Sequence, residues 1–290
     1  MSFNNKSRLD PSQVQDRRGR GSGTKVAVGG GVSLVIFVVA LLLGVNPSNL
    51  TQLLGGAASA PETTTSSYND LATTCQTGAD ANKSQECAIV GYVNSFQAFW
   101  TDEFSAHGAE YQPAQTILFT GSTEAACGYA SAAMGPFYCP NDQSVYLDLS
   151  FFDELETKYG AQGGPFAEAY VLAHEYGHHV QHLLGVLNTA GYSSTGPQSE
   201  AVAIELQADC LAGVWMHNAM QTGYIAQITE DDLRSALNAA ESIGDDRIQK
   251  QVQGYVSPES WTHGSSAQRE AALIDGIKLG DIETCSTPGT

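Results

Sequence analysis

The fold is predicted by one stretch, PFAEAYVLAHEYGHHVQHLLG, at residues 165–185. Pro165 suits the first turn of a helix, and Gly185 suits a left-handed C-terminal cap because it has no Cβ atom. The stretch therefore predicts one continuous helix. Residues four apart on a helix share a face, with Cβ atoms about 5–6 Å apart. His174 and His178 could therefore direct imidazole nitrogens at the same metal ion.

Glu175 directly follows the first of these histidines and completes the pattern H-E-x-x-H. In zinc peptidases with this pattern, the two histidines bind the metal and the glutamate acts as a general base toward the attacking water. The alternative is a polar helix face that matches the pattern by chance. The helix-forming sequence on both sides of Glu175 favours the metal site.

Two further histidines follow on the same helix. His182 lies eight residues beyond His174, or about 12 Å along the helix axis, so one ion with bonds of about 2 Å cannot bind both. His179 points about 100° round the helix from His178. The sequence assigns neither His179 nor His182 to the metal.

A catalytic zinc ion has three protein ligands and keeps its fourth position for water. The predicted third ligand is Glu205, on a helix that begins after Ser199, a residue type that caps helices, and continues past Trp215. Asp209 shares a face with Glu205 and could accept the remaining ring N–H of a histidine ligand. The alternatives for the third ligand are Asp209 and Glu200. A solvated acidic face fits less well because the segment is mostly apolar. We expect one Zn²⁺ per chain.

Peptide hydrolysis at such a site also needs a donor to the developing oxyanion. His263 precedes a flexible polar run at residues 264–266 and is the predicted donor, with Tyr255 as an equal alternative. A lone histidine is more often structural, so a purely structural role is the competing interpretation. Asp245 and Asp246 fit either a contact behind the site or a helix cap.

The N-terminal residues differ in charge from the rest of the chain. The net charge is -18, yet residues 1–25 contain six Lys or Arg residues against two Asp residues. Nucleic-acid binding depends on clustered Lys and Arg, so the acidic body argues against a nucleic-acid partner.

Residues 26–45 carry no charge and almost no polar side chain, which suits a helix that crosses a hydrocarbon core of about 30 Å. Basic residues before this run and acidic sequence after it predict a cytoplasmic N-terminus and an extracytoplasmic body. A cleaved signal peptide is the alternative, but its cleavage-like sequence at residues 58–60 lies far beyond the apolar run. The sequence therefore predicts a single-pass protein of the cell membrane. Its parts would be a basic cytoplasmic tail, a transmembrane helix, a flexible stalk and a catalytic domain, at residues 1–25, 26–45, 46–70 and 71–290.

The cysteines agree with an extracytoplasmic body, because all six follow the apolar run and their number is even. Sequence alone does not fix their pairing. Closure of short loops favours two local pairs and leaves a third, and the pairs would be Cys75–Cys87, Cys127–Cys139 and Cys210–Cys285. The chain contains no C-x-x-C motif, so the sequence does not indicate zinc binding by thiolates.

β-branched and aromatic residues predict short strands at residues 116–119 and 144–149, ahead of the helices. Strands followed by helices indicate an α+β domain, mainly helical with a small β-sheet. Because the second strand directly precedes the metal-binding helix, we expect it to bind an extended peptide at a sheet edge.

The runs HEYGHHVQ at residues 174–181 and ELQADCLAGVW at 205–215 resemble a known family. Shorter matches occur at residues 127–128, 135–140, 146–149, 244–247 and 262–269. The family is the bacterial neutral zinc metallopeptidases, and the resemblance covers most of the chain from Leu71. It implies a zincin-like peptidase domain on a single-pass membrane protein. The spacing of Glu205 and Asp209 is similar to that in gluzincin peptidases, in which this glutamate binds zinc.

The expected function is therefore zinc-dependent hydrolysis of peptide bonds in proteins or peptides, by an endopeptidase rather than an exopeptidase. One alternative is a catalytically inactive, membrane-anchored scaffold or binding protein of the same fold, although the intact Glu175 argues against it. Another is a purely structural zinc site, but such sites are usually closed by four Cys or His ligands. The sequence gives no prediction of the oligomeric state or of cleavage specificity.

Overall fold

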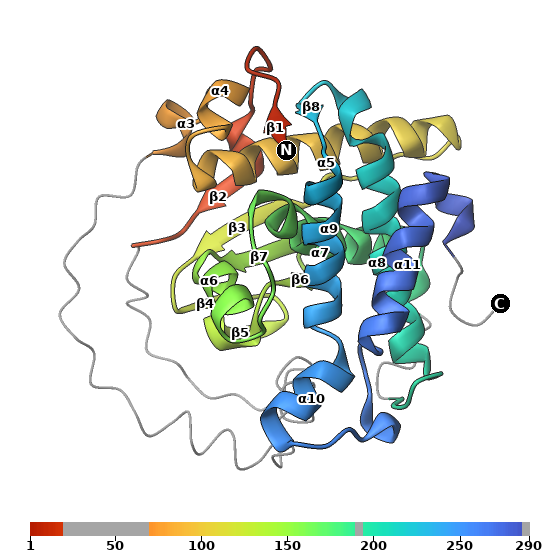
Figure 1. Ribbon diagram of the computed structural model, residues 1–290. Helices are drawn as coiled ribbons and strands as arrows, with labels where there is room; N and C mark the ends of the chain where they lie inside the picture. The colour runs from red at the N-terminus through yellow and green to blue at the C-terminus, as the bar shows by residue number, and fades with distance from the viewer. Residues whose placement is uncertain (20–69, 189–193, 286–290) are drawn as a thin grey trace.

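The computed structural model describes residues 1–19, 70–188 and 194–285, which form a mixed α+β fold. A small sheet packs beside a group of long helices (Figure 1). The helices are α3 (Leu71–Thr74), α4 (Gly78–Ala81), α5 (Gln85–Ala106), α6 (Ser150–Thr157), α7 (Pro165–Leu183), α8 (Glu200–Asn218), α9 (Glu230–Ser242), α10 (Asp245–Gln253) and α11 (Ser266–Leu279). The strands are β1 (Ser2–Phe3), β2 (Val14–Asp16), β3 (Gln115–Phe119), β4 (Ser122–Ala125), β5 (Gly128–Ser131), β6 (Phe137–Cys139), β7 (Ser144–Asp148) and β8 (Ile225–Gln227).

The main sheet has the strand order β2-β3-β7-β6. Strands β3 and β7 confirm the two predicted strands to within one residue. The prediction that the 144–149 strand binds substrate at a sheet edge is wrong. β7 is not an edge strand, because it pairs with β3 along its whole length and with β6 at residues 144–146. The three residues of β6, the outer strand, are themselves buried.

The helices that carry the predicted site pack unusually closely because glycines lie at their contacts. A Cβ atom at Gly177 of α7 would come within 2.8 Å of the Ala208 carbonyl oxygen of α8. At Gly213 of α8 it would come within 2.4 Å of the Leu273 carbonyl oxygen of α11. Both separations are too short for a side chain, so glycine at these positions allows α7, α8 and α11 to meet.

The helix ends agree with the sequence analysis. Pro165 is the first residue of α7, and Gly185 has the positive φ of 78° that was predicted after its C-terminus. The hydroxyl of Ser199 accepts a hydrogen bond from the backbone N–H of Val202 and caps α8. The three disulfide pairs are also confirmed, at Cys75–Cys87, Cys127–Cys139 and Cys210–Cys285.

Residues 1–18, which we call the N-terminal arm, are packed on the domain. β1 pairs with β8, and β2 joins the main sheet as a parallel neighbour of β3. The sequence predicted a separate tail at residues 1–25. The structure corrects this prediction for residues 1–18, which are packed on the domain. The reason is that the apolar side chains of Phe3, Leu9 and Val14 are buried among those of the domain.

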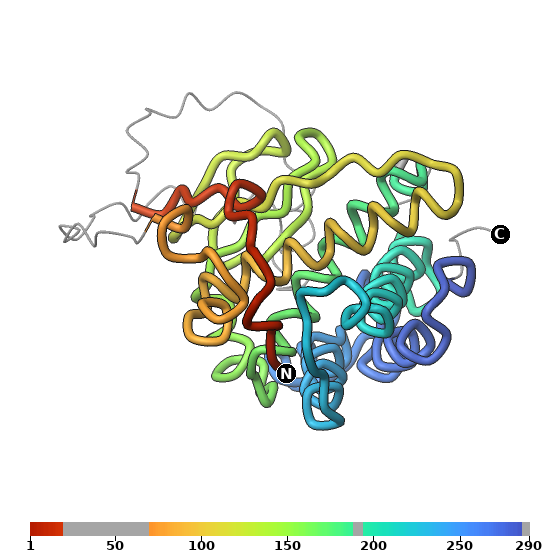
Figure 2. The backbone as a smooth tube through the Cα atoms, turned by 90° about the horizontal axis from the view of Figure 1, so that it is seen from above, coloured from red at the N-terminus to blue at the C-terminus, as the bar shows by residue number. Residues whose placement is uncertain are grey.

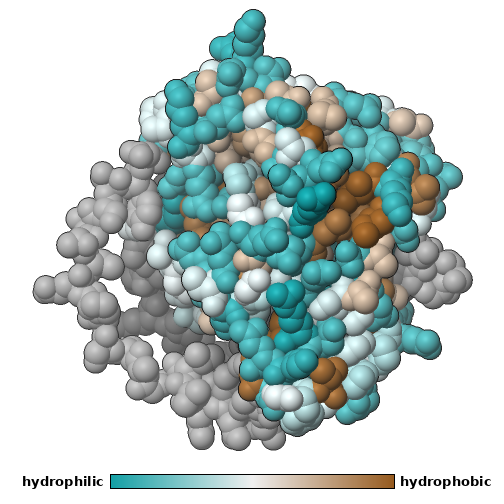
Figure 3. Space-filling view, viewed as in Figure 1, coloured by the Kyte–Doolittle hydropathy of each residue, from teal (hydrophilic) through white to brown (hydrophobic). Residues whose placement is uncertain are grey.

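Within residues 1–19, 70–188 and 194–285, no helix is long and apolar enough to cross a membrane. The predicted transmembrane helix at residues 26–45 lies outside the described residues, as does the predicted stalk up to residue 69. The face of the molecule in Figure 3 is mostly hydrophilic, with separate apolar patches on its helical side.

The packing of the arm leads to a first prediction. Phe3 is 3% exposed and its ring centroid lies 5.0 Å from that of Tyr92. Phe3→Ala should lower the free energy of unfolding by about 3–5 kcal/mol, the usual effect of removing a buried aromatic ring. Urea denaturation of the full chain measures this change, with the exposed Lys6→Ala as the matched control. Equal stability of the two variants would show that the arm does not contribute to folding.

A second prediction concerns Glu168, in the first turn of α7. It lines a cavity of about 230 Å³ under the arm, and burial raises the pKa of its carboxyl to about 7. The folded state therefore binds this proton more tightly than the unfolded state, whose glutamate pKa is about 4.3, and stability falls as the pH rises between these values. Glu168→Gln should be about as stable as the wild type at pH 4 and more stable at pH 8, by up to about 3 kcal/mol.

Thermal or urea denaturation across this pH range tests the prediction. Glu230→Gln is the control, because the Glu230 side chain is 88% exposed. A stability difference between the Glu168→Gln variant and the wild type that did not change with pH would contradict this account.

Candidate metal centre

Three of the predicted site residues come together where α7 meets α8. His174 and His178 of α7 and Glu205 of α8 each offer one ligand atom, and these atoms lie within 4.8 Å of one another. In the described parts of the chain, no other group of three His, Cys, Asp or Glu side chains is arranged to hold a metal ion.

The two imidazole rings present the same nitrogen to the Glu205 carboxylate. His174 Nε2 lies 3.2 Å from Glu205 Oε2, and His178 Nε2 lies 3.6 Å from Glu205 Oε1. The ring centroids of the two histidines are 4.7 Å apart. One turn of helix between the histidines and the close contact of α7 with α8 at Gly177 produce this arrangement.

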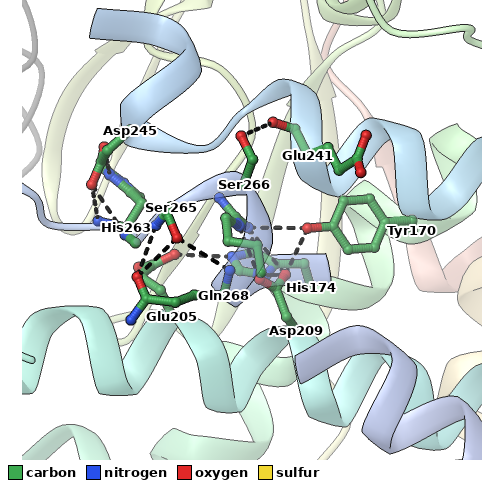
Figure 4. Close-up of polar contacts among 12 residues, drawn as sticks. Tyr170, His174, Glu205, Asp209, Glu241, Asp245, His263, Ser265, Ser266 and Gln268 are labelled. Atoms are coloured by element: carbon green, nitrogen blue, oxygen red, sulfur yellow. Dashed lines mark hydrogen bonds and ion pairs between the residues drawn. The ribbon is translucent and has the colours of Figure 1, made fainter. Parts of the chain in front are cut away.

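The other nitrogen of His174 is held by Asp209, as the sequence analysis proposed. His174 Nδ1 donates to Asp209 Oδ1 over 2.8 Å, which directs Nε2 toward Glu205. The Tyr170 hydroxyl donates to the same oxygen over 2.6 Å. Figure 4 shows Tyr170, His174 and Asp209 converging on this contact.

Arg269 of α11 neutralises Asp209, and the sequence analysis did not assign it a role. Its Nε donates to Asp209 Oδ2 over 2.9 Å, and its Nη2 donates to Oδ1 over 3.0 Å. Asp209 is fully buried and Arg269 is 2% exposed. Burial alone would raise the pKa of Asp209, but Arg269 and His174 lower it to about 2. The sequence did contain a signal that could have identified Arg269. A buried carboxylate needs a cation nearby, and the domain has few basic residues that could supply one.

His178 is oriented by a second residue that the sequence analysis missed. Its Nδ1 donates to Gln181 Oε1 over 2.8 Å. The Gln181 amide in turn donates to the Ile204 carbonyl and to Gln207 Oε1, both on α8. Gln181 lies three residues after His178 on α7, and this spacing could have indicated the contact.

Glu175 lies beside the cluster and is 8% exposed. Burial raises the pKa of its carboxyl, and the neighbouring Glu205 charge acts in the same direction. His178 and His174 act in the opposite direction. A carboxylate with a raised pKa is better suited to accept and release a proton near neutral pH.

His263 approaches Glu205 from the loop before α11 (Figure 4). Burial lowers the pKa of its imidazole, but the charges of Glu205 and Asp245 outweigh burial and raise it. Asp245 Oδ1 lies 3.4 Å from His263 Nδ1, and Asp245 Oδ2 accepts the backbone N–H groups of residues 262–264. Asp245 therefore fixes the loop that presents His263. The alternative donor, Tyr255, is 62% exposed.

The remaining candidates are not part of the cluster. The Nε2 atom of His179 donates to the Gln112 carbonyl, and its Nδ1 accepts from the Tyr138 hydroxyl, so both ring nitrogens are occupied. Burial lowers the pKa of His179 to about 4, so the ring is neutral. His182 and Glu200 are not among the three residues whose ligand atoms come together.

The donor set fits a catalytic zinc ion. Two imidazoles and one carboxylate are among the ligand sets of such ions, and they leave one coordination position open. Burial raises the pKa of Glu205, but the nearby His178, His263 and His174 outweigh burial and lower it, so the ligand is ionised. The second nitrogen of each histidine is already hydrogen-bonded, as is usual for zinc ligands.

Comparison with known proteins agrees with this geometry. Residues 1–288 match the family described as "Putative neutral zinc metallopeptidase". The chain belongs to this family. The Mycobacterium tuberculosis protein Rv2575 is 44% identical over 259 residues, covering 86% of this chain and 84% of its own. The Escherichia coli K12 protein YpfJ is 37% identical over 295 residues, covering 97% of each chain. Both relatives are named as uncharacterized proteins, and no solved structure matches the chain.

A third prediction tests how His174 is held in place. Arg269→Gln and Asp209→Asn should each weaken zinc binding by about 10–100-fold, because the ring would lose its fixed orientation. The double variant should be about as weak as either single variant, since the two residues act as one unit. Competition with a chelator measures the affinity. The control is Arg234→Gln, at an exposed ion pair on α9; if its effect equalled that of Arg269→Gln, Arg269 would have no specific role.

Proposed function

We propose that the protein is a zinc-dependent peptidase in which His174, His178 and Glu205 bind one zinc ion per chain and Glu175 is the general base. The observation that carries the proposal is the buried Glu175 carboxylate next to two histidines and a glutamate arranged as metal ligands. Zinc, when bound, would lower the pKa of a water ligand to about 7 and polarise the carbonyl group of the peptide. The domain at residues 71–290 is proposed to be zincin-like on the same grounds.

Glu175 would accept a proton from the attacking water and pass it to the leaving amine. Its burial supports this role, because burial raises the pKa of the carboxyl and brings it closer to the working pH. The close contact between α7 and α8 supports it as well, since both helices are fixed relative to each other at Gly177.

His263 would donate a hydrogen bond to the oxyanion that develops on the peptide carbonyl. Its proximity to Glu205 and its contact with Asp245 support this role. Both negative charges favour a protonated ring, which is a better donor. Tyr255 is less suited because its side chain is largely exposed.

We propose an endopeptidase rather than an exopeptidase. An exopeptidase that removes C-terminal residues needs a cation to bind the terminal carboxylate of the substrate. The buried cation beside the site, Arg269, is already paired with both oxygens of Asp209. Peptides blocked at both ends should therefore be cleaved, and mass spectrometry of the products would show internal cuts.

The domain is proposed to work outside the cytoplasm, because three disulfides persist only in an oxidising compartment. The apolar run at residues 26–45 supports attachment to the cell membrane.

The fourth prediction separates zinc binding from catalysis. Glu175→Gln should keep the wild-type zinc content and lower kcat for peptide cleavage by at least about 10²–10⁴-fold, the range attributed to general-base catalysis. Zinc analysis and a peptide-library assay on the same preparations measure both quantities. Glu205→Ala should lose zinc as well as activity.

Two results would contradict the proposal. A wild-type protein that binds zinc stoichiometrically but cleaves no peptide in a broad library would support the scaffold alternative. Full zinc content in Glu205→Ala would exclude Glu205 as the third ligand.

A further inference from the structure

The N-terminal arm contacts widely separated parts of the domain. β1 pairs with β8, which follows α8, and β2 pairs with β3 of the main sheet. Arg8 forms an isolated β-bridge with Thr77, at the start of α4. Figure 2 shows the arm, in red, running beside α4 and the start of α5.

Two asparagine side chains of the domain form paired hydrogen bonds with the backbone of the arm. Asn94 accepts from the Asp10 N–H over 2.7 Å and donates to the Asp10 carbonyl over 3.0 Å. Asn82 forms the same pair of contacts with Phe3, at 2.8 and 3.0 Å. Asn94 is 1% exposed, so removing the arm would leave its amide without these partners. The domain is therefore built to bind this backbone.

Two glycines of the domain make room for the arm. A Cβ atom at Gly91 of α5 would lie 2.4 Å from the Phe3 ring. At Gly78 of α4 it would lie 2.0 Å from the Asn4 carbonyl oxygen. A side chain fits at neither position, so the arm and these helices are shaped for each other.

The basic residues of the arm also contact the body of the protein. Arg18 pairs with Asp16 over 2.8 Å and with Glu86 of α5 over 3.4 Å. The Arg17 guanidinium lies 5.9 Å from the centre of the Tyr146 ring on β7. These arginines contributed to the positive charge that predicted a cytoplasmic N-terminus. In the structure they serve contacts within the domain, so their charge is weak evidence about orientation.

We infer that residues 1–18 and the metal-binding domain lie in the same compartment. Strand pairing and buried hydrogen bonds cannot form between segments on opposite sides of a bilayer. This inference differs from the charge-based expectation of a cytoplasmic N-terminus and an extracytoplasmic body. It depends on the contacts of the arm and not on the proposed peptidase activity.

Labelling of single cysteines in the full chain tests this topology. All six native cysteines are in disulfides, so an introduced cysteine is the only free thiol. Lys6→Cys places a thiol on the arm and Lys250→Cys places one on α10, and both positions are exposed. Each variant is treated with a membrane-impermeant maleimide in sealed spheroplasts and again after lysis. A cytoplasmic protein with a surface cysteine serves as the control for leakage.

We expect the two variants to behave alike, with both labelled in sealed spheroplasts if the domain is outside the cytoplasm. Labelling of both only after lysis would also support a shared compartment, and would place it in the cytoplasm. Labelling of Lys250→Cys before lysis and of Lys6→Cys only after lysis would overturn the inference.

An engineered disulfide provides a second measurement. Ser2 and Gln227 are partners across β1 and β8. Cβ atoms of such partners are about 4.5–5.5 Å apart, near the spacing of a disulfide. The full chain with Ser2→Cys and Gln227→Cys should form a fourth disulfide under oxidising conditions, seen by mass spectrometry of a non-reduced digest. Two unpaired thiols in oxidised, folded protein would show that the arm is not docked and would overturn the inference.

Discussion

The buried charge of Asp209 is the constraint around which the metal centre is arranged. A carboxylate without solvent is stable only if its charge is balanced and its oxygens are hydrogen-bonded. Arg269 supplies the balancing charge from α11, and Tyr170 and His174 supply further donors from α7. Helices α7 and α11 are therefore both held to one side chain on α8. This contact directs His174 Nε2 toward Glu205, and glycines at the helix contacts allow the necessary approach.

Local chemistry made much of the site predictable. Positions four apart on one helix place His174 and His178 together regardless of the rest of the fold. Glu205 and Asp209 were identifiable because carboxylates in an apolar helix need partners. The same reasoning fixed the helix ends at Pro165 and Gly185, since each residue type suits few backbone conformations.

Contacts between distant segments were not predictable in the same way. Arg269 lies 60 residues from its partner Asp209, and nothing in its neighbourhood in the sequence marks the pair. The position of β7 inside the sheet depends on its pairing with β3 and β6, which strand composition does not reveal. The packing of the arm was not predicted because a basic stretch before an apolar run is typical of a cytoplasmic tail. Its buried Phe3, Leu9 and Val14 are too widely spaced to form a recognisable pattern.

The most direct test of the metal centre is a crystal structure of the zinc-loaded protein with anomalous diffraction data collected at the zinc absorption edge. The account predicts one strong anomalous peak per chain, about 2.0–2.2 Å from His174 Nε2, His178 Nε2 and a carboxylate oxygen of Glu205, with a fourth position open to solvent. A peak at another place, or a fourth protein ligand that closes the site, would contradict it.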